Sequence, residues 1–275
     1  MQVNLFPKVC NAVRAMAECC TKSGTPVAKS EVYNETWLLR MVLACIHDCT
    51  EETFVTHNKK IGDTLKKIHK AVRQQWISEG GLGPAFVQEG TTWTDAILGN
   101  VKISGDNKRG VKYEMRDAST GVIIVEAKMG SELSSGITNS PDYNQAARNI
   151  ACLAKLLIEQ NASPAVISES AFVVLAPRSK LEEWEKDENS PQQLINGAWK
   201  TINAQKRTRT RSVECDFDTT FKSMVENIKD NSIALSWDDV IDAIQPNDTN
   251  LFSGVPISYL RDFYKIACSE INVNK

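Results

Sequence analysis

Apolar residues recur at helical spacing at both ends of the chain. In the first 80 residues this spacing predicts three amphipathic helices, at 5–20, 31–47 and about 50–76, the last ended by the glycine- and proline-rich stretch 80–84. After residue 178 it predicts five further helices, at 179–187, 191–206, 216–229, 236–244 and 256–270. The chain should therefore carry helical parts on either side of a central segment of a different kind.

The central segment has the shorter apolar runs that are typical of strands. We expect strands at 95–103, 111–116 and 122–128, with 117–121 as a hairpin turn between the last two. A helix at 143–157, starting near Pro141, precedes a fully apolar strand at 171–175. A helix followed by a buried strand is the crossover of a parallel pair. The pattern predicts one α/β domain, with helices in 1–80, a mixed sheet in 90–177 and further helices in 178–275.

The strongest strand ends in charged residues. Val122 to Val125 are apolar, and Glu126, Ala127 and Lys128 follow at once. Residues i and i+2 of a strand point to the same face, so Glu126 and Lys128 should project side by side. A carboxylate beside a lysine suits divalent-metal chemistry, in which the carboxylate holds the ion and the lysine stabilises developing negative charge. A solvated, inert ion pair is the alternative.

With an acidic residue upstream and a glutamine-bearing helix downstream, this Glu-x-Lys resembles the PD-(D/E)XK, or restriction-endonuclease-like, nuclease superfamily over about residues 30–177. The resemblance implies a mixed sheet flanked by helices and Mg²⁺ (or Mn²⁺) held by Asp95, Glu126 and the Ala127 carbonyl. It implies that Lys128 positions the attacking water or neutralises charge. It also implies catalytic support from Glu35, on an earlier helix, and from Gln145. Gln145 and Arg148 share one face of the downstream helix.

The sequence departs from the family pattern in two respects. Thr94 stands where a proline is expected, and 31 positions separate Asp95 from Glu126, so a strand or hairpin must be inserted between them. Glu114 and Asp117 are nearer to Glu126 in sequence and compete with Asp95 for the role of second acid.

Several polar segments are candidates for contact with DNA. These are the small-residue loop after Lys128, the basic loop 104–110, the cation-rich run 206–211 and one helical arginine, with the candidate residues Ser131, Ser134, Arg148, Lys108, Arg109, Arg207, Arg209 and Arg211. Charged runs are more often solvated loops. The lysines of 59–70 are expected on the wet face of their helix.

Composition narrows the class of protein further. A chain of 275 residues with 24% charged and 42% hydrophobic residues is typical of globular proteins. With a net charge of −2, the protein would have to bind a nucleic-acid partner through local basic surfaces. The eight cysteines lie mostly in apolar helical patterns. Cys45 and Cys49 are four positions apart on a predicted helix, which indicates packing in the core rather than a zinc site. We therefore expect the cysteines to be reduced thiols. Neither a signal peptide nor a membrane span is apparent, which favours a cytoplasmic location.

These patterns lead us to expect a Mg²⁺-dependent endo- or exonuclease acting on DNA in restriction, repair or phage defence. RNA as substrate and a homodimer both stay open. A non-catalytic DNA-binding or assembly protein of the same fold is the alternative. A helical interaction protein with a coincidental Glu-x-Lys is the third interpretation.

Overall fold

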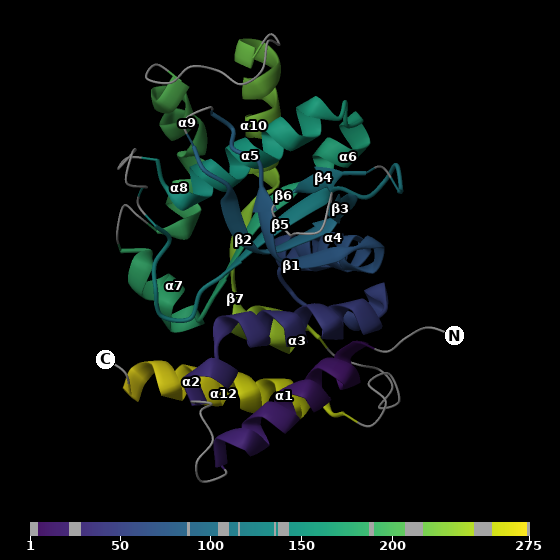
Figure 1. The fold of residues 1–275 in the computed structure, drawn as a ribbon, viewed down its shortest axis with the longest axis vertical. Helices are drawn as coiled ribbons and strands as arrows, with labels where there is room; N and C mark the ends of the chain where they lie inside the picture. The colour runs from purple at the N-terminus through teal and green to yellow at the C-terminus, as the bar shows by residue number, and fades with distance from the viewer. Residues whose placement is uncertain are drawn as a thin grey trace.

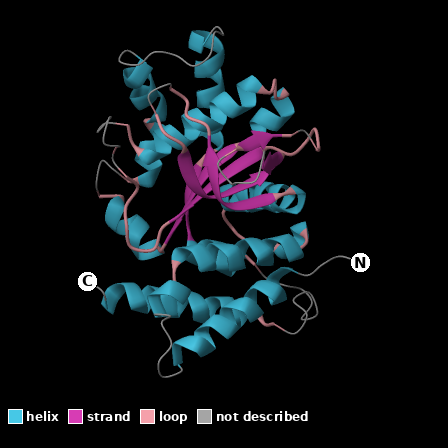
Figure 2. Ribbon diagram, in the orientation of Figure 1, coloured by secondary structure: helices cyan, strands magenta, loops and turns pink. Residues whose placement is uncertain are grey.

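A mixed five-stranded sheet lies between two layers of helices in the computed structural model (Figures 1 and 2). The structure describes residues 5–21, 29–86, 89–103, 110–114, 116–134, 136, 143–186, 190–206, 217–244 and 255–273. In sheet order, the strands are β1 (Trp76–Leu82), β2 (Thr92–Gly99), β5 (Val122–Ala127), β6 (Ala171–Ala176) and β7 (Ile233–Ser236). The first three are antiparallel, whereas β5, β6 and β7 are parallel. The predicted α/β class with a mixed central sheet is thus confirmed.

One face of the sheet is covered by helices from both ends of the chain. They are α1 (Leu5–Thr21), α2 (Lys29–Val32), α3 (Glu35–Asp48), α4 (Lys59–Gln74), α11 (Trp237–Ala243) and α12 (Ile257–Val273), together with the 3-10 turn Glu51–Thr53. They share a core with Ala96, Val125 and Val173 of the sheet. Cys45 and Cys49 are buried free thiols of this core. The first 80 residues therefore bury their apolar faces together with the last 40.

The opposite face packs against a second set of helices. They are α5 (Gln145–Glu159), α6 (Pro164–Ser168), α8 (Pro191–Asn196), α9 (Ala198–Lys206) and α10 (Lys222–Asn231), with a π-turn at Phe217–Phe221. Figure 1 shows α5, α9 and α10 on this side and α1, α3 and α12 on the other. Ile97, Ile124 and Phe172 supply the sheet side of this core. A further helix, α7 (Arg178–Trp184), packs near β7. Within the described ranges, no helix combines the length and apolarity needed to cross a bilayer.

Two predictions about the strands are wrong. The strand expected at 95–103 begins at Thr92 and breaks after Gly99, where a separate two-stranded sheet of β3 (Val101–Ile103) and β4 (Val111–Tyr113) starts. Gly99 has a φ of 102°, and a Cβ there would lie 2.0 Å from the carbonyl oxygen of Gly121, so only glycine fits. The expected hairpin of 111–116 with 122–128 does not form, because β4 pairs with β3 and β5 pairs with β2.

Helix boundaries differ from the predictions where polar side chains cap the backbone. The helix expected at 31–47 is interrupted at Asn34, whose side chain accepts from the Trp37 N–H and starts α3. The helix expected from about 50 begins instead at Lys59, capped by Asn58. Residues 76–82, expected as a helix end and a glycine-rich break, form the edge strand β1. Pro141, where the glutamine helix was expected to start, lies outside the described residues.

Candidate active site

Asp95 and Glu126 occupy facing positions on neighbouring strands. The paired run of β2 and β5 ends at Ala96 and Val125, so Asp95 and Glu126 are the next residues opposite each other. Directly opposed residues of antiparallel strands have Cβ atoms about 5 Å apart and side chains on the same face. The Asp95 carboxylate is close enough to Glu126 for its charge to raise the pKa of Glu126. The structure therefore brings together the two acids that the sequence proposes.

The Glu126 carboxylate is buried, and only one of its two oxygens has hydrogen-bond partners. The residue is 3% exposed. Its Oε1 accepts from the Lys128 ammonium at 2.8 Å and from the Gln145 amide at 2.5 Å. Its Oε2 is buried without a hydrogen-bond partner. Burial, with a smaller contribution from the Asp95 carboxylate, raises the pKa of Glu126 to about 7. An extra positive charge, from a proton or a cation, is needed at this carboxyl pair.

The Asp95 side chain, in place of a backbone carbonyl, accepts a hydrogen bond from the end of β5. Its Oδ2 accepts from the Ala127 N–H at 2.7 Å, which fixes the carboxylate against the end of β5. Burial raises the pKa of Asp95, and the Ala127 N–H offsets part of that increase. The competing acids lie elsewhere: Glu114 donates its backbone N–H to Asn100, and Asp117 accepts from Ser119 and Thr120 in the turn before β5. Both acids are thus near the far end of β2.

Lys128 lies beside Glu126, as the strand period predicts. Its ammonium is 2.8 Å from Glu126 Oε1, and its side chain is 14% exposed. Its backbone is held on both sides, because the N–H donates to Leu175 O at 2.7 Å and the carbonyl accepts from Trp237 Nε1 at 2.9 Å. Strand β6 and the first residue of α11, far along the chain, therefore fix the position of this lysine.

Gln145 joins Glu126 to the loop that follows Lys128. It is the first residue of α5, capped by Asn144, whose side chain accepts from the Ala147 N–H. The Gln145 amide nitrogen donates to Glu126, its Oε1 accepts from the Ser134 N–H at 3.2 Å, and its own N–H donates to the Ser134 carbonyl at 2.8 Å. The loop, the helix terminus and the buried acid are thus held together by one side chain.

The other predicted residues have weaker connections to this site or lie outside the described chain. Glu35 begins α3, and none of the described contacts joins it to Asp95 or Glu126. Arg148 lies one turn beyond Gln145, with its Nε buried and without a partner in the described structure. Ser131 is exposed, and the Ser134 hydroxyl donates to Gly136 O at 2.7 Å. The residues outside the described chain are Lys108, Arg109, Arg207, Arg209 and Arg211.

Two residues near the site carried no signal in the sequence. Glu79 lies on β1 and is close enough to Asp95 for its charge to raise the pKa of Asp95 further. The sequence did not predict strand β1, because the glycine- and proline-rich residues 80–84 are typical of a loop. Trp237 was assigned only to a helix start, since a contact between residues 109 positions apart leaves no local pattern.

The carboxyl pair fits the ligand preference of a magnesium ion. Mg²⁺ binds oxygen ligands and is commonly held by one or two carboxylates together with water and substrate phosphates. Glu126 Oε2 is a buried acceptor with an unfilled position, and Asp95 lies next to it. As the side chains stand, no group of three or more His, Cys, Asp or Glu in the described part of the chain is arranged to hold a metal. Two carboxylates are therefore the protein ligands that the site offers.

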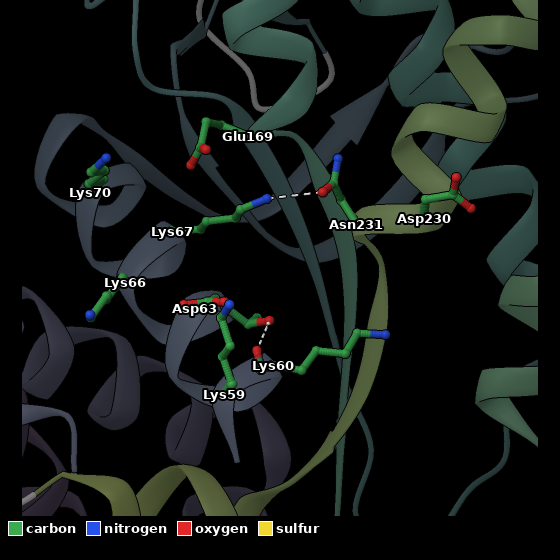
Figure 3. Close-up of a pocket in the computed structure, with 10 residues that line it drawn as sticks. Lys59, Lys60, Asp63, Lys66, Lys67, Lys70, Glu169, Asp230 and Asn231 are labelled. Carbon is green, nitrogen blue, oxygen red and sulfur yellow. Dashed lines mark hydrogen bonds between the residues drawn. The ribbon is translucent and has the colours of Figure 1, made fainter. Parts of the chain in front are cut away.

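A lysine-rich hollow lies at the other edge of the sheet. Its volume is about 570 Å³, and it is lined by Lys59, Lys60, Lys66, Lys67 and Lys70 of α4 and by the ends of α6 and α10. Figure 3 shows these lining residues. Its wall residues Glu169 and Asn231 lie two residues before the starts of β6 and β7, whereas Glu126 is near the other end of β5, which is parallel to β6. Lys67 donates to Ser168 O at 2.9 Å and to Asn231 Oδ1 at 3.0 Å. The hollow is thus separate from the carboxyl pair.

No protein-family model, curated protein or solved structure matches this chain. The chemistry of the site follows from its own side chains: a buried carboxyl pair flanked by an ammonium and an amide.

Proposed function

We propose that the protein is a Mg²⁺-dependent nuclease that hydrolyses phosphodiester bonds of DNA. The observation that carries this proposal is the unpartnered, buried Glu126 Oε2 beside Asp95, at a strand end that also presents Lys128. Burying a carboxyl pair without a compensating charge costs free energy, and a strand filled only for packing would place apolar residues here. A divalent cation accounts for both the burial and the missing partner.

The side chains divide the chemistry between them. Asp95 and Glu126 would hold the ion, with the Ala127 carbonyl a candidate third oxygen. When bound, Mg²⁺ supplies a Lewis acid for the scissile phosphate and lowers the pKa of a bound water. Lys128 carries a positive charge next to the reacting group and neutralises negative charge that develops on the phosphate. Gln145 keeps Glu126 oriented and holds Ser134, in the loop after Lys128, against the site.

The arrangement of the sheet supports the same proposal. Three antiparallel strands place Asp95 opposite Glu126, and helix α5 then crosses to the parallel strand β6. A mixed sheet flanked by helices, with both acids and the lysine at one strand end, is what a restriction-endonuclease-like nuclease requires. The parallel strands β5, β6 and β7 end at the same edge, where ligands of α/β proteins commonly bind.

Nicking of supercoiled plasmid tests this proposal. We expect cleavage with Mg²⁺ or Mn²⁺, none with EDTA, and a loss of at least about 100-fold in rate for Asp95→Asn and for Glu126→Gln. Glu114→Gln and Asp117→Asn are matched controls, since both acids lie away from the site, and they should cleave normally. If the wild type binds neither metal and cuts no DNA or RNA, the nuclease proposal fails.

A non-catalytic DNA-binding protein of the same fold is the second candidate. The observation that favours it is the direct bond of Lys128 to Glu126 Oε1, which would let the pair satisfy itself as a structural ion pair. Salt-sensitive DNA binding without cleavage would support this candidate.

A further inference from the structure

The lysine-rich hollow carries an excess of positive charge in a protein whose net charge is −2. Its five lysines all come from α4, and the acids that line it are Asp63, Glu169 and Asp230. Four of the lysines are exposed, and Lys67 is half-buried. Within the described residues, none of the five lysines forms an ion pair with a carboxylate. The hollow therefore presents cations that the protein itself does not neutralise.

Lys67 connects α4 to the segments that precede β6 and β7. Its ammonium donates to Ser168 O at 2.9 Å and to Asn231 Oδ1 at 3.0 Å, and Figure 3 shows it reaching toward Asn231. Both acceptors are uncharged, so these bonds fix the ammonium in place and leave its charge uncompensated. A fixed cation beside four exposed lysines favours an anionic ligand.

The lysines are spread along α4 rather than gathered at one point. Lys59, Lys66 and Lys70 follow one another at intervals of seven and four residues, which places them on one side of the helix. At a rise of about 1.5 Å per residue, they extend over about 16 Å of the helix. This length matches about five nucleotide steps of a DNA strand, at about 3.4 Å each. An extended polyanion therefore fits this surface better than a single phosphate group.

The other residues of the lining indicate which form of polyanion fits. Besides the lysines and acids, the lining contains only Thr64 and Asn231, so it presents no aromatic ring. Unpaired bases bind proteins largely by stacking on aromatic side chains, and the hollow offers no such platform. Lysines contact phosphates as point charges and carry no information about sequence. The lining therefore suits the backbone of a duplex.

We propose that the lysine-rich hollow binds the phosphate backbone of a nucleic-acid duplex, without regard to sequence. This inference goes beyond the proposed function, because it requires neither a metal ion nor cleavage. Glu126 is level with Val174 of β6, about 16 Å along the strand direction from Glu169 in the wall of the hollow. The hollow therefore provides a contact with the duplex that is separate from the carboxyl pair.

Fluorescence anisotropy with a labelled DNA duplex of about 20 base pairs, measured in EDTA at several salt concentrations, tests this inference. We expect Lys66→Gln/Lys70→Gln to bind at least about tenfold more weakly than the wild type, with a salt slope smaller by about 2. Both lysines are exposed helix positions that glutamine tolerates, so the variant should fold. Lys8→Gln/Lys265→Gln makes the same change of charge on α1 and α12 and should match the wild type. Glu169→Gln removes a carboxylate from the wall and should tighten binding.

Three results would overturn the inference. The first is a wild-type protein that does not bind the duplex, or a Lys66→Gln/Lys70→Gln variant with unchanged affinity and salt slope. The second is tighter binding of a single strand of equal length. The third is displacement of the duplex by poly-L-glutamate at equal charge concentration, which would indicate an acidic protein as the partner. Binding through the hollow without any cleavage would remove only the nuclease proposal, and cleavage without binding through the hollow would remove only this one.

Discussion

The indole nitrogen of Trp237 donates a hydrogen bond of 2.9 Å to the carbonyl of Lys128, across 109 positions of sequence. Trp237 is fully buried at the start of α11, directly after β7. Lys128 follows β5, two strands away in the sheet. The residue that carries the positive charge of the site is therefore positioned by a helix near the end of the chain.

Trp237→Phe should slow cleavage without weakening metal binding. The phenyl ring keeps most of the packing and loses the bond to Lys128, so we expect about a tenfold lower kcat and about 2 kcal/mol less stability. Plasmid nicking, Mn²⁺ calorimetry and thermal unfolding provide the three measurements. Trp184→Phe, at a buried tryptophan of α7, is the control and should lose stability but keep its kcat. Equal losses of kcat in both variants would argue against a positioning role.

Lys128→Ala should abolish cleavage and preserve the fold, because the lysine ends a strand and contributes little to the core. Removing a preorganised charge costs on the order of 10²–10³ in rate. Lys128 also lowers the pKa of Glu126, so Mn²⁺ binding should be compared at about pH 9, where the carboxylate is ionised. There, the affinity should persist or increase slightly. Lys102→Ala, which removes an exposed partner of Glu114, should leave the rate unchanged. Full activity of Lys128→Ala would disprove the mechanism.

The metal-free protein should lose stability as the pH rises, because of Glu126. Its pKa is raised from 4.5 in the unfolded chain to about 7 in the folded protein, so the folded state binds more protons between these values. Its stabilising contribution is full below pH 4.5 and is lost as the pH rises through about 7, by about 3 kcal/mol. Denaturant unfolding in EDTA should show this slope in the wild type and a reduced slope in Glu126→Gln.

The control for that titration is Glu114→Gln. The hydrogen bond from Lys102 lowers the pKa of Glu114, so its contribution is present at neutral pH and is lost on acidification. The variant should therefore change the pH dependence at low pH and in the opposite direction. An identical pH profile for the wild type and Glu126→Gln would contradict the raised pKa.

Gln145→Ala should weaken metal binding and loosen the loop after Lys128. The change removes the donor to Glu126 Oε1 and the acceptor of the Ser134 N–H, so we expect 10–100-fold weaker Mn²⁺ binding. The free energy of unfolding should fall by about 2 kcal/mol. Gln192→Ala loses a comparable bond to the Ala234 N–H, in a different part of the sheet. It should lose stability alone, and equal metal affinities of the two variants would exclude the orienting role of Gln145.

Local patterns predict the parts of the site that depend on a single element. The period of a strand places Lys128 beside Glu126, and the length of the apolar runs identifies β5, α5 and β6. The contact between Glu126 and Gln145, in contrast, depends on where α5 begins. Asn144 caps the helix so that Gln145 is its first residue, whereas the sequence suggested a start four residues earlier. The contact between Gln145 and Glu126 therefore depends on a helix start that the sequence placed too early.

The remaining features depend on contacts between distant segments. The edge strand β1 contains two consecutive glycines, and the four-residue β7 is too short for a periodic signal, so neither has a local signature. Glu79 could not be recognised before β1 was known, because only the pairing of β1 with β2 brings its charge near Asp95. Cross-strand neighbours of this kind follow from pairing, which no local window contains.

Because β2 ends at Gly99, the number of residues between Asp95 and Glu126 does not determine how the two acids are placed. The chain leaves β2 at Gly99 and returns at Gly121, in direct contact with it, and Asn100 binds the returning segment through the carbonyls of Asp117 and Thr120. The β3–β4 segment is therefore a closed excursion with adjacent ends. Residues added between β3 and β4 should therefore leave Asp95 and Glu126 opposed, provided that the core residues Val101, Val111 and Tyr113 are kept, which makes this connection a suitable place to graft a new recognition element onto the protein.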